Sequence, residues 1–299
     1  MSRVLVVGSI NLDLVIRAER FPVPGETLGE GAFATFPGGK GANQAVAASR
    51  LGAEVALLGC VGGDAFGDRL LSGLAAEGVD TGSVRRAAHV ASGVAMITVA
   101  GGENAIVLAP GANHALRPED ITAASRLFAW AEVVLCQLEI PLASVLAAAE
   151  QAVRHGCPFI LNPAPAVPLP QRVMELSTLL TPNAHELSLL FPEADSREAL
   201  LSARAPQLLY TDGCQGVWYA DSAGIIRHQP AFKVEAIDST GAGDTFNGAL
   251  AAFWDFPRED ALRMAAAAAA LSVTRAGAQS GMPTYAELEV FLHQAKVQS

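Results

Sequence analysis

Apolar residues along this chain occur in two patterns that alternate from one end to the other. Short continuous apolar runs predict buried strands, and they occupy residues 4–7, 55–59, 133–138, 159–162 and 208–211. Apolar residues at helical spacing predict helices, and they occupy residues 42–51, 66–77, 141–155, 244–254, 258–273 and 285–293. The alternation predicts an α/β fold in which right-handed crossovers form a mainly parallel sheet with helices on both faces.

Two segments depart from this alternation and have β character of their own. Residues 14–36 are rich in turn residues, and residues 93–109 contain two short strands around the turn GGEN, which predicts a hairpin. Because both interrupt an otherwise α/β chain, we expect them to pair into a small sheet that acts as a lid over the functional site. The remainder of residues 1–299 is expected to form one domain with this lid.

Composition narrows the class of protein. The chain has 299 residues, 51% of them hydrophobic, which is enough for one large core. A net charge of -10 without a Lys/Arg-rich run argues against a nucleic-acid binder. No secretory signal or membrane span is recognisable, and Cys60, Cys136, Cys157 and Cys214 form no CxxC pair. We therefore expect a cytoplasmic protein with reduced thiols.

The segment 238–244, DSTGAGD, contains the strongest candidate chemistry. Gly241, Ala242 and Gly243 precede a predicted helix, so their amides and the helix dipole favour a bound phosphate. Asp244 lies in the first helical turn, where it would act as general base toward a hydroxyl that attacks a phosphoryl group. An acidic residue is also common at a helix start for structural reasons alone.

Polar residues follow two of the predicted strands. Asn11 and Asp13 come after the first strand and would share a face if the chain stays extended, offering an amide and a carboxylate to hydroxyl groups. A strand-end turn capped by Asn and Asp is the alternative. Glu139 directly follows residues 133–138. Carboxyl ends of parallel strands meet at the ligand-binding edge of an open sheet, so these side chains are expected together.

The glycine-rich motif PGGKGAN, residues 37–43, precedes another predicted helix. Gly39, Lys40 and Asn43 would offer an N–H, an ammonium and an amide to a polyhydroxylated ligand, although such motifs are often plain turns. It is not a phosphate-binding Walker loop, because Gly41 stands where that loop needs Ser or Thr. No GxGxxG follows the first strand, which disfavours a dinucleotide-dependent oxidoreductase.

Two further segments have the character of a nucleotide site. Asn183 and Glu186 are three residues apart at a helix start, which predicts either a capping box or a pair that orients hydrated Mg²⁺ and phosphate oxygens. The turn DGCQG, residues 212–216, follows a predicted strand and leaves backbone groups available for a nucleotide.

Seven motifs together resemble those of the ribokinase-like (PfkB) sugar kinase family, in that family's order and spacing over essentially the whole chain. They are GSINLD, PGGKGANQAVAA, CQLE, LNPAPA, TPNAHE, DSTGAGDTFNGAL and VTRAGAQ. The resemblance implies a three-layer fold with a β lid that also joins a homodimer. It also implies phosphorylation of the 5-hydroxyl of D-ribose by ATP, with Mg²⁺ and stimulatory K⁺, and no nucleic-acid or membrane partner.

The resemblance assigns roles residue by residue. The sugar would be bound by Asn11, Asp13, Gly39, Lys40, Asn43 and Glu139, with Asp244 as catalytic base. The nucleotide would be bound by Asn183, Thr211, Asp212, Gly213, Cys214, Gln215, Gly216, Gly243 and Asp244. Amides of Gly241, Ala242 and Gly243 would form an anion hole, and Glu186 would hold Mg²⁺ through water. Potassium would be bound by Asp238, Thr240, Ser272, Arg275, Gly277 and Gly281, although serine is common in the family at the position of Gly281.

Two other functions remain open at this point. A related kinase for another sugar or a nucleoside, such as deoxyribose or adenosine, would share these motifs. A non-catalytic sugar sensor would keep the fold but would not need the base at Asp244. Asn11 and Asp13 favour a small furanose, because a positioned polar group rejects a substrate that leaves it unpaired.

Overall fold

The computed structural model describes residues 2–297, and its centre is a six-stranded parallel sheet. The strands follow the order β12-β11-β10-β1-β4-β6, and each neighbouring pair is parallel. They are β1 (Arg3–Val7), β4 (Glu54–Leu58), β6 (Val79–Asp80), β10 (Val133–Cys136), β11 (Phe159–Leu161) and β12 (Leu179–Leu180). This arrangement confirms the mainly parallel sheet that the apolar runs predict.

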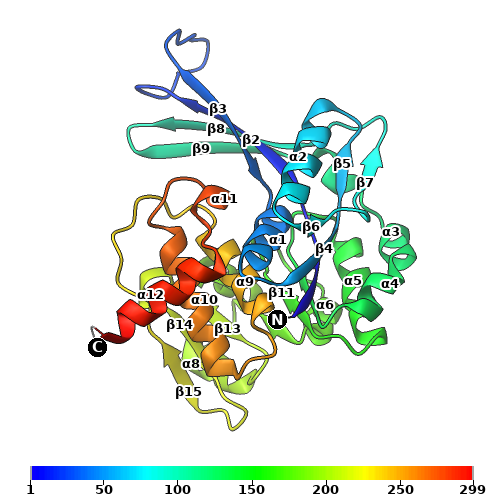
Figure 1. Cartoon of the computed structure of the whole chain (residues 1–299), viewed down its shortest axis with the longest axis vertical. Helices are drawn as coiled ribbons and strands as arrows, with labels where there is room; N and C mark the ends of the chain where they lie inside the picture. The colour runs from blue at the N-terminus through cyan, green and yellow to red at the C-terminus, as the bar shows by residue number, and fades with distance from the viewer. Residues whose placement is uncertain (1, 298–299) are drawn as a thin grey trace.

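Helices cover both faces of this sheet and produce three layers (Figure 1). Successive side chains of a strand point to opposite faces, so Val4 and Val6 of β1 pack into one core while Leu5 and Val7 pack into the other. The first core includes side chains of α1 (Lys40–Arg50), α2 (Ala65–Ala76), α9 (Ala242–Ala252), α10 (Arg258–Ser272) and α12 (Tyr285–Val297). The second includes side chains of α3 (Pro118–Ala123), α4 (Ser125–Trp130), α5 (Leu142–Arg154), α6 (Gln171–Leu176), α7 (Ala184–Leu190) and α8 (Arg197–Ala203). Burial on both faces explains why the strands are continuously apolar.

Smaller elements extend this core. An antiparallel sheet of β13 (Leu209–Thr211), β14 (Val217–Ala220) and β15 (Ile226–Gln229) adjoins β12 through single parallel bridges. The remaining elements are β5 (Cys60–Gly62) paired with β7 (Arg85–Ala87), α11 (Ala278–Gly281), and the short 3-10 helices η1 (Gly111–Ala115) and η2 (Gly213–Gln215). Within residues 2–297, no helix has both the length and the apolar character needed to cross a bilayer.

The two segments of β character do pair, as predicted, into a separate four-stranded sheet. It has the order β3-β2-β8-β9 and projects from one end of the main body, as Figure 1 shows. Its strands are β2 (Asn11–Arg17), β3 (Ala32–Gly38), β8 (Gly93–Ala100) and β9 (Glu103–Ala109). The predicted hairpin is β8 and β9 around Gly101 and Gly102. The sheet begins earlier than expected, because the chain is already extended at Asn11.

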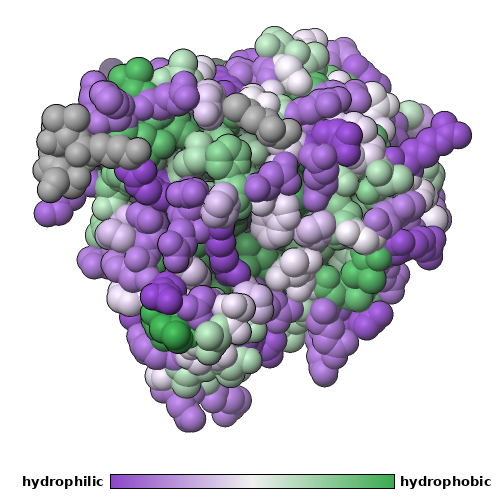
Figure 2. All heavy atoms as spheres, turned by 60° about the horizontal axis from the view of Figure 1, so that its bottom comes forward, coloured by the Kyte–Doolittle hydropathy of each residue, from purple (hydrophilic) through white to green (hydrophobic). Residues whose placement is uncertain are grey.

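One face of the four-stranded sheet carries large exposed apolar side chains. Phe33 is paired with Ile16, and Met96 is paired with Val107, so the four side chains share this face. Phe33, Met96 and Val107 are 65%, 57% and 70% exposed. The opposite end of the molecule is different, since Figure 2 shows a mainly polar surface there with apolar patches separated by polar side chains. Exposed apolar side chains are therefore concentrated on this sheet face.

Candidate active site

The glycine-rich loop before α9 has a backbone shape that requires glycine. Gly241 has φ +77° and ψ 5°, in the left-handed region, and a Cβ there would lie 2.9 Å from the Cβ of Ala278. A Cβ on Gly243 would meet nothing within 4 Å, so the loop is open on that side. The amide of Ala242 donates to the Ser239 carbonyl at 3.2 Å. Among the described residues, the amides of Gly241 and Gly243 have no acceptor, which leaves them available to an anion.

Asp244 is held in one orientation by two amide side chains of α1. Its Oδ2 accepts a hydrogen bond from Asn43 Nδ2 at 2.9 Å, and its Oδ1 accepts one from Gln44 Nε2 at 3.0 Å. The Asp244 side chain is only 8% exposed. Helices α1 and α9 approach closely enough for these bonds because small residues line their interface: a Cβ on Gly248 would lie 2.5 Å from the Gln44 carbonyl oxygen. The arrangement fixes a carboxylate beside the glycine-rich loop.

A network of buried amide side chains holds Asn43 and Gln44 in place. Gln44 Nε2 also donates to Asn162 Oδ1 at 3.1 Å, and Gln44 Oε1 accepts from Gln137 Nε2 at 2.6 Å. Gln279 Nε2 donates to Asn43 Oδ1 at 3.1 Å. Gln279 belongs to α11, so hydrogen bonds connect α11 to Asp244 through Asn43. Sequence reasoning missed Gln44, Gln137, Asn162 and Gln279, although each lies within a motif that it singled out.

Lys40 and several carboxylates share the space around Asp244. Burial, followed by the negative charges of Glu139 and Asp244, raises the pKa of Asp13 to about 6. Burial alone would lower the pKa of Lys40, but Asp244, Glu139 and Glu186 together raise it. The site therefore holds one ammonium group among several acidic groups. This set of hydrogen-bond donors and acceptors suits a ligand with many hydroxyl groups together with a second ligand that donates a phosphate group.

Asn11 and Asp13 lie on the same face of β2, which settles the choice between an extended strand and a turn in favour of the strand. Asn113 Nδ2 donates to Asn11 Oδ1 at 2.6 Å, and Asn113 Oδ1 accepts from the Ile10 amide at 2.8 Å. The Asp13 carboxylate lies over Gly38, where a Cβ would come within 2.6 Å of it. Asn113 is a positioning residue that the sequence did not reveal, because it follows the lid hairpin far along the chain.

Glu139 connects the first residues of α1 to the edge of the central sheet. Its Oε2 accepts from the Lys40 amide at 3.1 Å and from Ser9 Oγ at 2.5 Å. Gly39, with φ +89°, lies against the backbone of residues 9–11. These contacts bring GSINLD and CQLE together, as their positions at strand ends predict, and they add the PGGKGAN motif at the start of α1.

Asn183 and Glu186 form the capping box that their spacing predicts. The Glu186 amide donates to Asn183 Oδ1 at 3.0 Å, and the Asn183 amide donates to Glu186 Oε2 at 2.9 Å. Burial is the main reason that the pKa of Glu186 is raised. Glu186 also interacts with the charges of Lys40 and Asp244, so it lies close enough to serve the same site.

The turn after β13 lies beside this capping box. Thr211 bridges to Asn183 in parallel, and the Asp212 amide donates to the Gly216 carbonyl at 2.8 Å. Gly213 and Gly216 both have positive φ, 50° and 96°. Cys214 and Gln215 are exposed on the turn, and the bridge from Thr211 makes Asn183 its neighbour.

Hydrogen bonds and close approaches connect the residues predicted to bind a cation. Asp238 Oδ1 accepts from the amide and the hydroxyl of Thr240, at 2.9 and 2.6 Å, and Asp238 Oδ2 accepts from the Gly277 amide at 2.8 Å. Burial opposes ionisation of Asp238, but these hydrogen bonds outweigh it and lower its pKa. A Cβ on Gly281 would lie 2.5 Å from the Ser272 carbonyl oxygen and 3.5 Å from that of Arg275. The Gly281 amide donates to the Gly277 carbonyl at 3.2 Å, which connects this pair of contacts to those of Asp238.

In residues 2–297, no group of three or more His, Cys, Asp or Glu side chains is arranged to hold a metal ion. Glu186 is the acidic residue of the predicted nucleotide region that is both buried and close to Asp244. Its carboxylate has the hard oxygen atoms that bind Mg²⁺ or its water shell.

Comparison with known proteins identifies the family. Residues 1–285 match the model of the pfkB family carbohydrate kinases. The chain is 45% identical over 294 residues to a ribokinase of Bacillus subtilis, covering 98% of this chain and 100% of that protein. It is 36% identical over 306 residues to a deoxyribokinase of Salmonella typhi, covering 97% and 98%.

A solved structure agrees with these sequence matches. The Arabidopsis thaliana ribokinase complexed with ribose and ATP has a TM-score of 0.90 and 31% identity, covering 97% of this chain and 98% of that one. The three-layer fold, the glycine-rich loop before α9 and the full-length matches agree with one another. This chain belongs to the pfkB family of carbohydrate kinases.

Proposed function

We propose that this protein phosphorylates D-ribose at its 5-hydroxyl with ATP, giving D-ribose 5-phosphate and ADP. The observation that carries the proposal is Asp244, a buried carboxylate held by Asn43 and Gln44 beside the open amides of Gly241 and Gly243. Full-length similarity to a ribokinase at 45% identity supports ribose as the sugar.

The residues of the proposed site have different roles in the reaction. Asn11, Asp13, Gly39, Lys40, Asn43 and Glu139 would orient the sugar hydroxyls. Asp244 would accept the proton of the attacking hydroxyl as the oxygen–phosphorus bond forms and the bond to ADP breaks. Amides at the start of α9 would stabilise the negative charge on the transferring group.

The nucleotide would bind on the other side of the same loop. Asn183, the turn at residues 211–216 and Gly243 would contact ATP, and Glu186 would hold Mg²⁺ through a water molecule. When bound, Mg²⁺ neutralises charge on the phosphates. We place K⁺ between the Asp238 carboxylate and the carbonyls around Gly281, which would stiffen the loop that presents Gly241.

A substrate panel tests the sugar. We expect kcat/KM for D-ribose to exceed the values for 2-deoxyribose, fructose and adenosine. A poorer substrate leaves hydrogen-bonding groups of the site unpaired, which lowers its kcat/KM. The similarity to a deoxyribokinase makes 2-deoxyribose the specific rival. A higher kcat/KM for 2-deoxyribose would transfer the assignment to that sugar, and binding without turnover of any sugar would favour a sensor.

The raised pKa of Asp13 predicts an acid limit to activity. When ionised, its carboxylate accepts hydrogen bonds from sugar hydroxyls at both oxygens, and protonation turns one of these oxygens into a donor. Protonation below its pKa of about 6 therefore weakens binding. We expect kcat/KM for ribose to fall roughly tenfold per pH unit below pH 6. In Asp13→Asn the value should be lower but flat from about pH 5.5 to 7. An unchanged acid limb in that variant would show that another group titrates.

The contacts of Asp238 predict a response of turnover to potassium. Because Asp238 ties the loop before α9 to the loop after α10, a cation at this point should organise Gly241 for catalysis. We expect K⁺ to raise turnover several-fold and Asp238→Asn to lose this response. Asp255→Asn, which removes the same charge at an exposed position, should keep it. Equal turnover of the native protein with and without K⁺ would contradict the assignment.

We further propose that the four-stranded sheet is both a lid and a dimer interface. The exposed face with Phe33, Met96 and Val107 supports this, since an apolar sheet face loses unfavourable contact with water when a second copy covers it. Sedimentation velocity at micromolar concentration should give a dimer, and Phe33→Asp should give a monomer. Val290→Asp on α12, 58% exposed, is the matched control and should stay dimeric. A monomeric native protein would refute the interface.

A further inference from the structure

A cavity of about 250 Å³ lies at the end of α9 that is remote from Gly241. Its lining residues are Thr178, Leu179, Pro206, Leu209, Leu250, Trp254, Phe256 and Arg258. The eleven residues of α9 span roughly 16 Å, so this cavity is separate from the candidate active site. No residue assigned above to the sugar, the nucleotide or a cation lines it.

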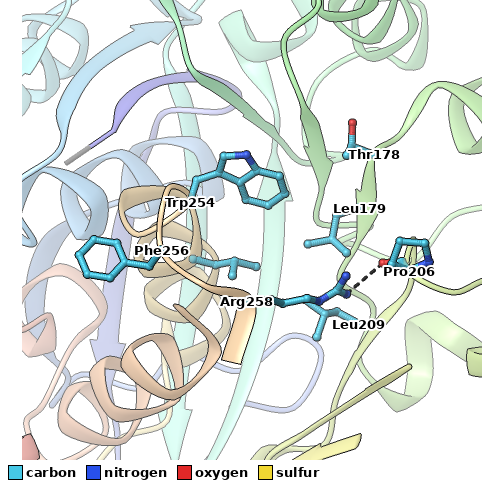
Figure 3. A pocket seen from close by; sticks show the side chains of 8 residues that line it. Thr178, Leu179, Pro206, Leu209, Trp254, Phe256 and Arg258 are labelled. Atoms are coloured by element: carbon cyan, nitrogen blue, oxygen red, sulfur yellow. Dashed lines mark hydrogen bonds between the residues drawn. The ribbon is translucent and has the colours of Figure 1, made fainter. Parts of the chain in front are cut away.

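The cavity has a buried apolar floor and an accessible rim. Leu179, Leu209 and Leu250 form the floor and are at most 4% exposed, whereas Phe256 at the rim is 40% exposed. Figure 3 shows Trp254 and Phe256 on one side of the space and Leu179 and Leu209 on the other. Apolar walls with a few polar groups are typical of small-molecule sites.

One guanidinium stands in these apolar surroundings. Arg258 donates through Nη2 to the Pro206 carbonyl at 2.9 Å, the bond that is dashed in Figure 3. Its Cζ lies 5.2 Å from the ring centre of Tyr219. The Arg258 Nε atom is buried and has no hydrogen-bond partner among the described residues. Burial lowers the pKa of Arg258, and the nearby Tyr219 opposes this shift.

The Arg258 guanidinium is partly buried, with Nε fully enclosed, and lacks an opposite charge. A desolvated cation is stabilised by an opposite charge and by hydrogen bonds to each of its donors, and no carboxylate of residues 2–297 forms an ion pair with it. An anion in the cavity would supply both. A single negative charge suits the site better than a doubly charged phosphate, because one guanidinium and apolar walls cannot compensate two charges.

We propose that this cavity binds a small aromatic carboxylate, with its carboxylate on Arg258 and its ring against Leu179, Leu250 and Trp254. The volume exceeds the ~150 Å³ that is sufficient for one benzene ring in an apolar cavity. A flat ring would also pack against the indole of Trp254 in the offset or edge-on geometry that aromatic pairs prefer.

Phenylacetate and phenylacetamide provide a matched pair of probes, since they have nearly the same shape and differ in charge. Titration calorimetry on the complete chain should give a Kd of about 1 mM or tighter for phenylacetate and a value at least tenfold weaker for phenylacetamide. Saturating ribose, ATP and Mg²⁺ should leave phenylacetate binding unchanged. No binding of phenylacetate, equal affinity for both probes, or displacement by the substrates would overturn the proposal.

Substitutions test whether Arg258 supplies the charge that favours phenylacetate over phenylacetamide. Arg258→Met should remove the preference for phenylacetate, while Arg263→Met on the same helix, which removes a charge outside the cavity, should retain it. Phe256→Glu at the exposed rim should weaken the binding of phenylacetate and leave the binding of phenylacetamide unchanged. This variant tests the proposal even if Arg258→Met does not fold. Retention of the tenfold preference in Phe256→Glu or in folded Arg258→Met would contradict the assignment to this cavity.

Discussion

Asp244→Asn should lose turnover by about 10² to 10⁴-fold while retaining ribose binding. The factor is the contribution of a positioned general base, and an amide cannot accept the hydroxyl proton. The substitution also places an NH₂ group against one of two donors, Asn43 Nδ2 or Gln44 Nε2, so one of these hydrogen bonds is lost. Steady-state kinetics with ribose, together with calorimetry of ribose binding, separates the two effects.

Asp255→Asn is the control for this variant, because it makes the same chemical change on an exposed side chain that is remote from the loop. Its turnover should equal that of the native protein. Turnover of Asp244→Asn within tenfold of native would mean that another group accepts the proton. Loss of ribose binding in Asp244→Asn would instead indicate a collapsed site.

Gly241→Ala should lose turnover by roughly 10²-fold, comparable to removing one anion-hole donor. The left-handed conformation at φ +77° costs a non-glycine residue about 1–2 kcal/mol. The added Cβ would also lie 2.9 Å from the Cβ of Ala278, so α11 or the loop must move. Either movement tilts the amides at the start of α9 away from the phosphoryl group.

Gly224→Ala isolates the strain from the catalytic effect. Gly224 also has φ +77°, but the nearest atom to an added Cβ is the Ser202 carbonyl oxygen at 3.9 Å. It lies in the turn between β14 and β15, so its substitution should lower the free energy of unfolding by about 1–2 kcal/mol with native turnover. Native turnover in Gly241→Ala as well would show that this loop does not present its amides to the reaction.

The central fold follows from the sequence because its signals are local. A strand buried on both faces must be continuously apolar, and β1, β4, β10 and β11 lie where such runs occur. The long helices were predictable for the same reason, with most ends displaced by at most two residues: α9 begins at Ala242 rather than at Asp244, whereas α12 ends at Val297 rather than at residue 293. Short elements such as α3, α4 and α8 escaped prediction, since six or seven residues are too few to establish a helical period.

For the candidate site, the sequence predicts charged groups after strands, as for Asp13 and Glu139, and at the start of a helix, as for Asp244. The residues that hold these charged groups in place could not be predicted from the sequence. Gln44, Gln137, Asn162 and Gln279 come from four distant parts of the chain, and their roles depend on side-chain hydrogen bonds across helix and sheet. No periodicity marks a buried amide as a partner, so only the structure reveals how the carboxylate of Asp244 is held.

Phosphorus NMR of the product identifies the sugar hydroxyl that receives the phosphoryl group. The purified protein would be incubated with D-ribose, ATP and Mg²⁺, and the proton-coupled phosphorus signal of the product recorded. Phosphorylation at the 5-hydroxyl places phosphorus next to a CH₂ group, so coupling to two protons is the expected result. Coupling to a single proton would mean attack by another hydroxyl, and release of free phosphate alone would mean that no sugar accepts the group; either would contradict the account.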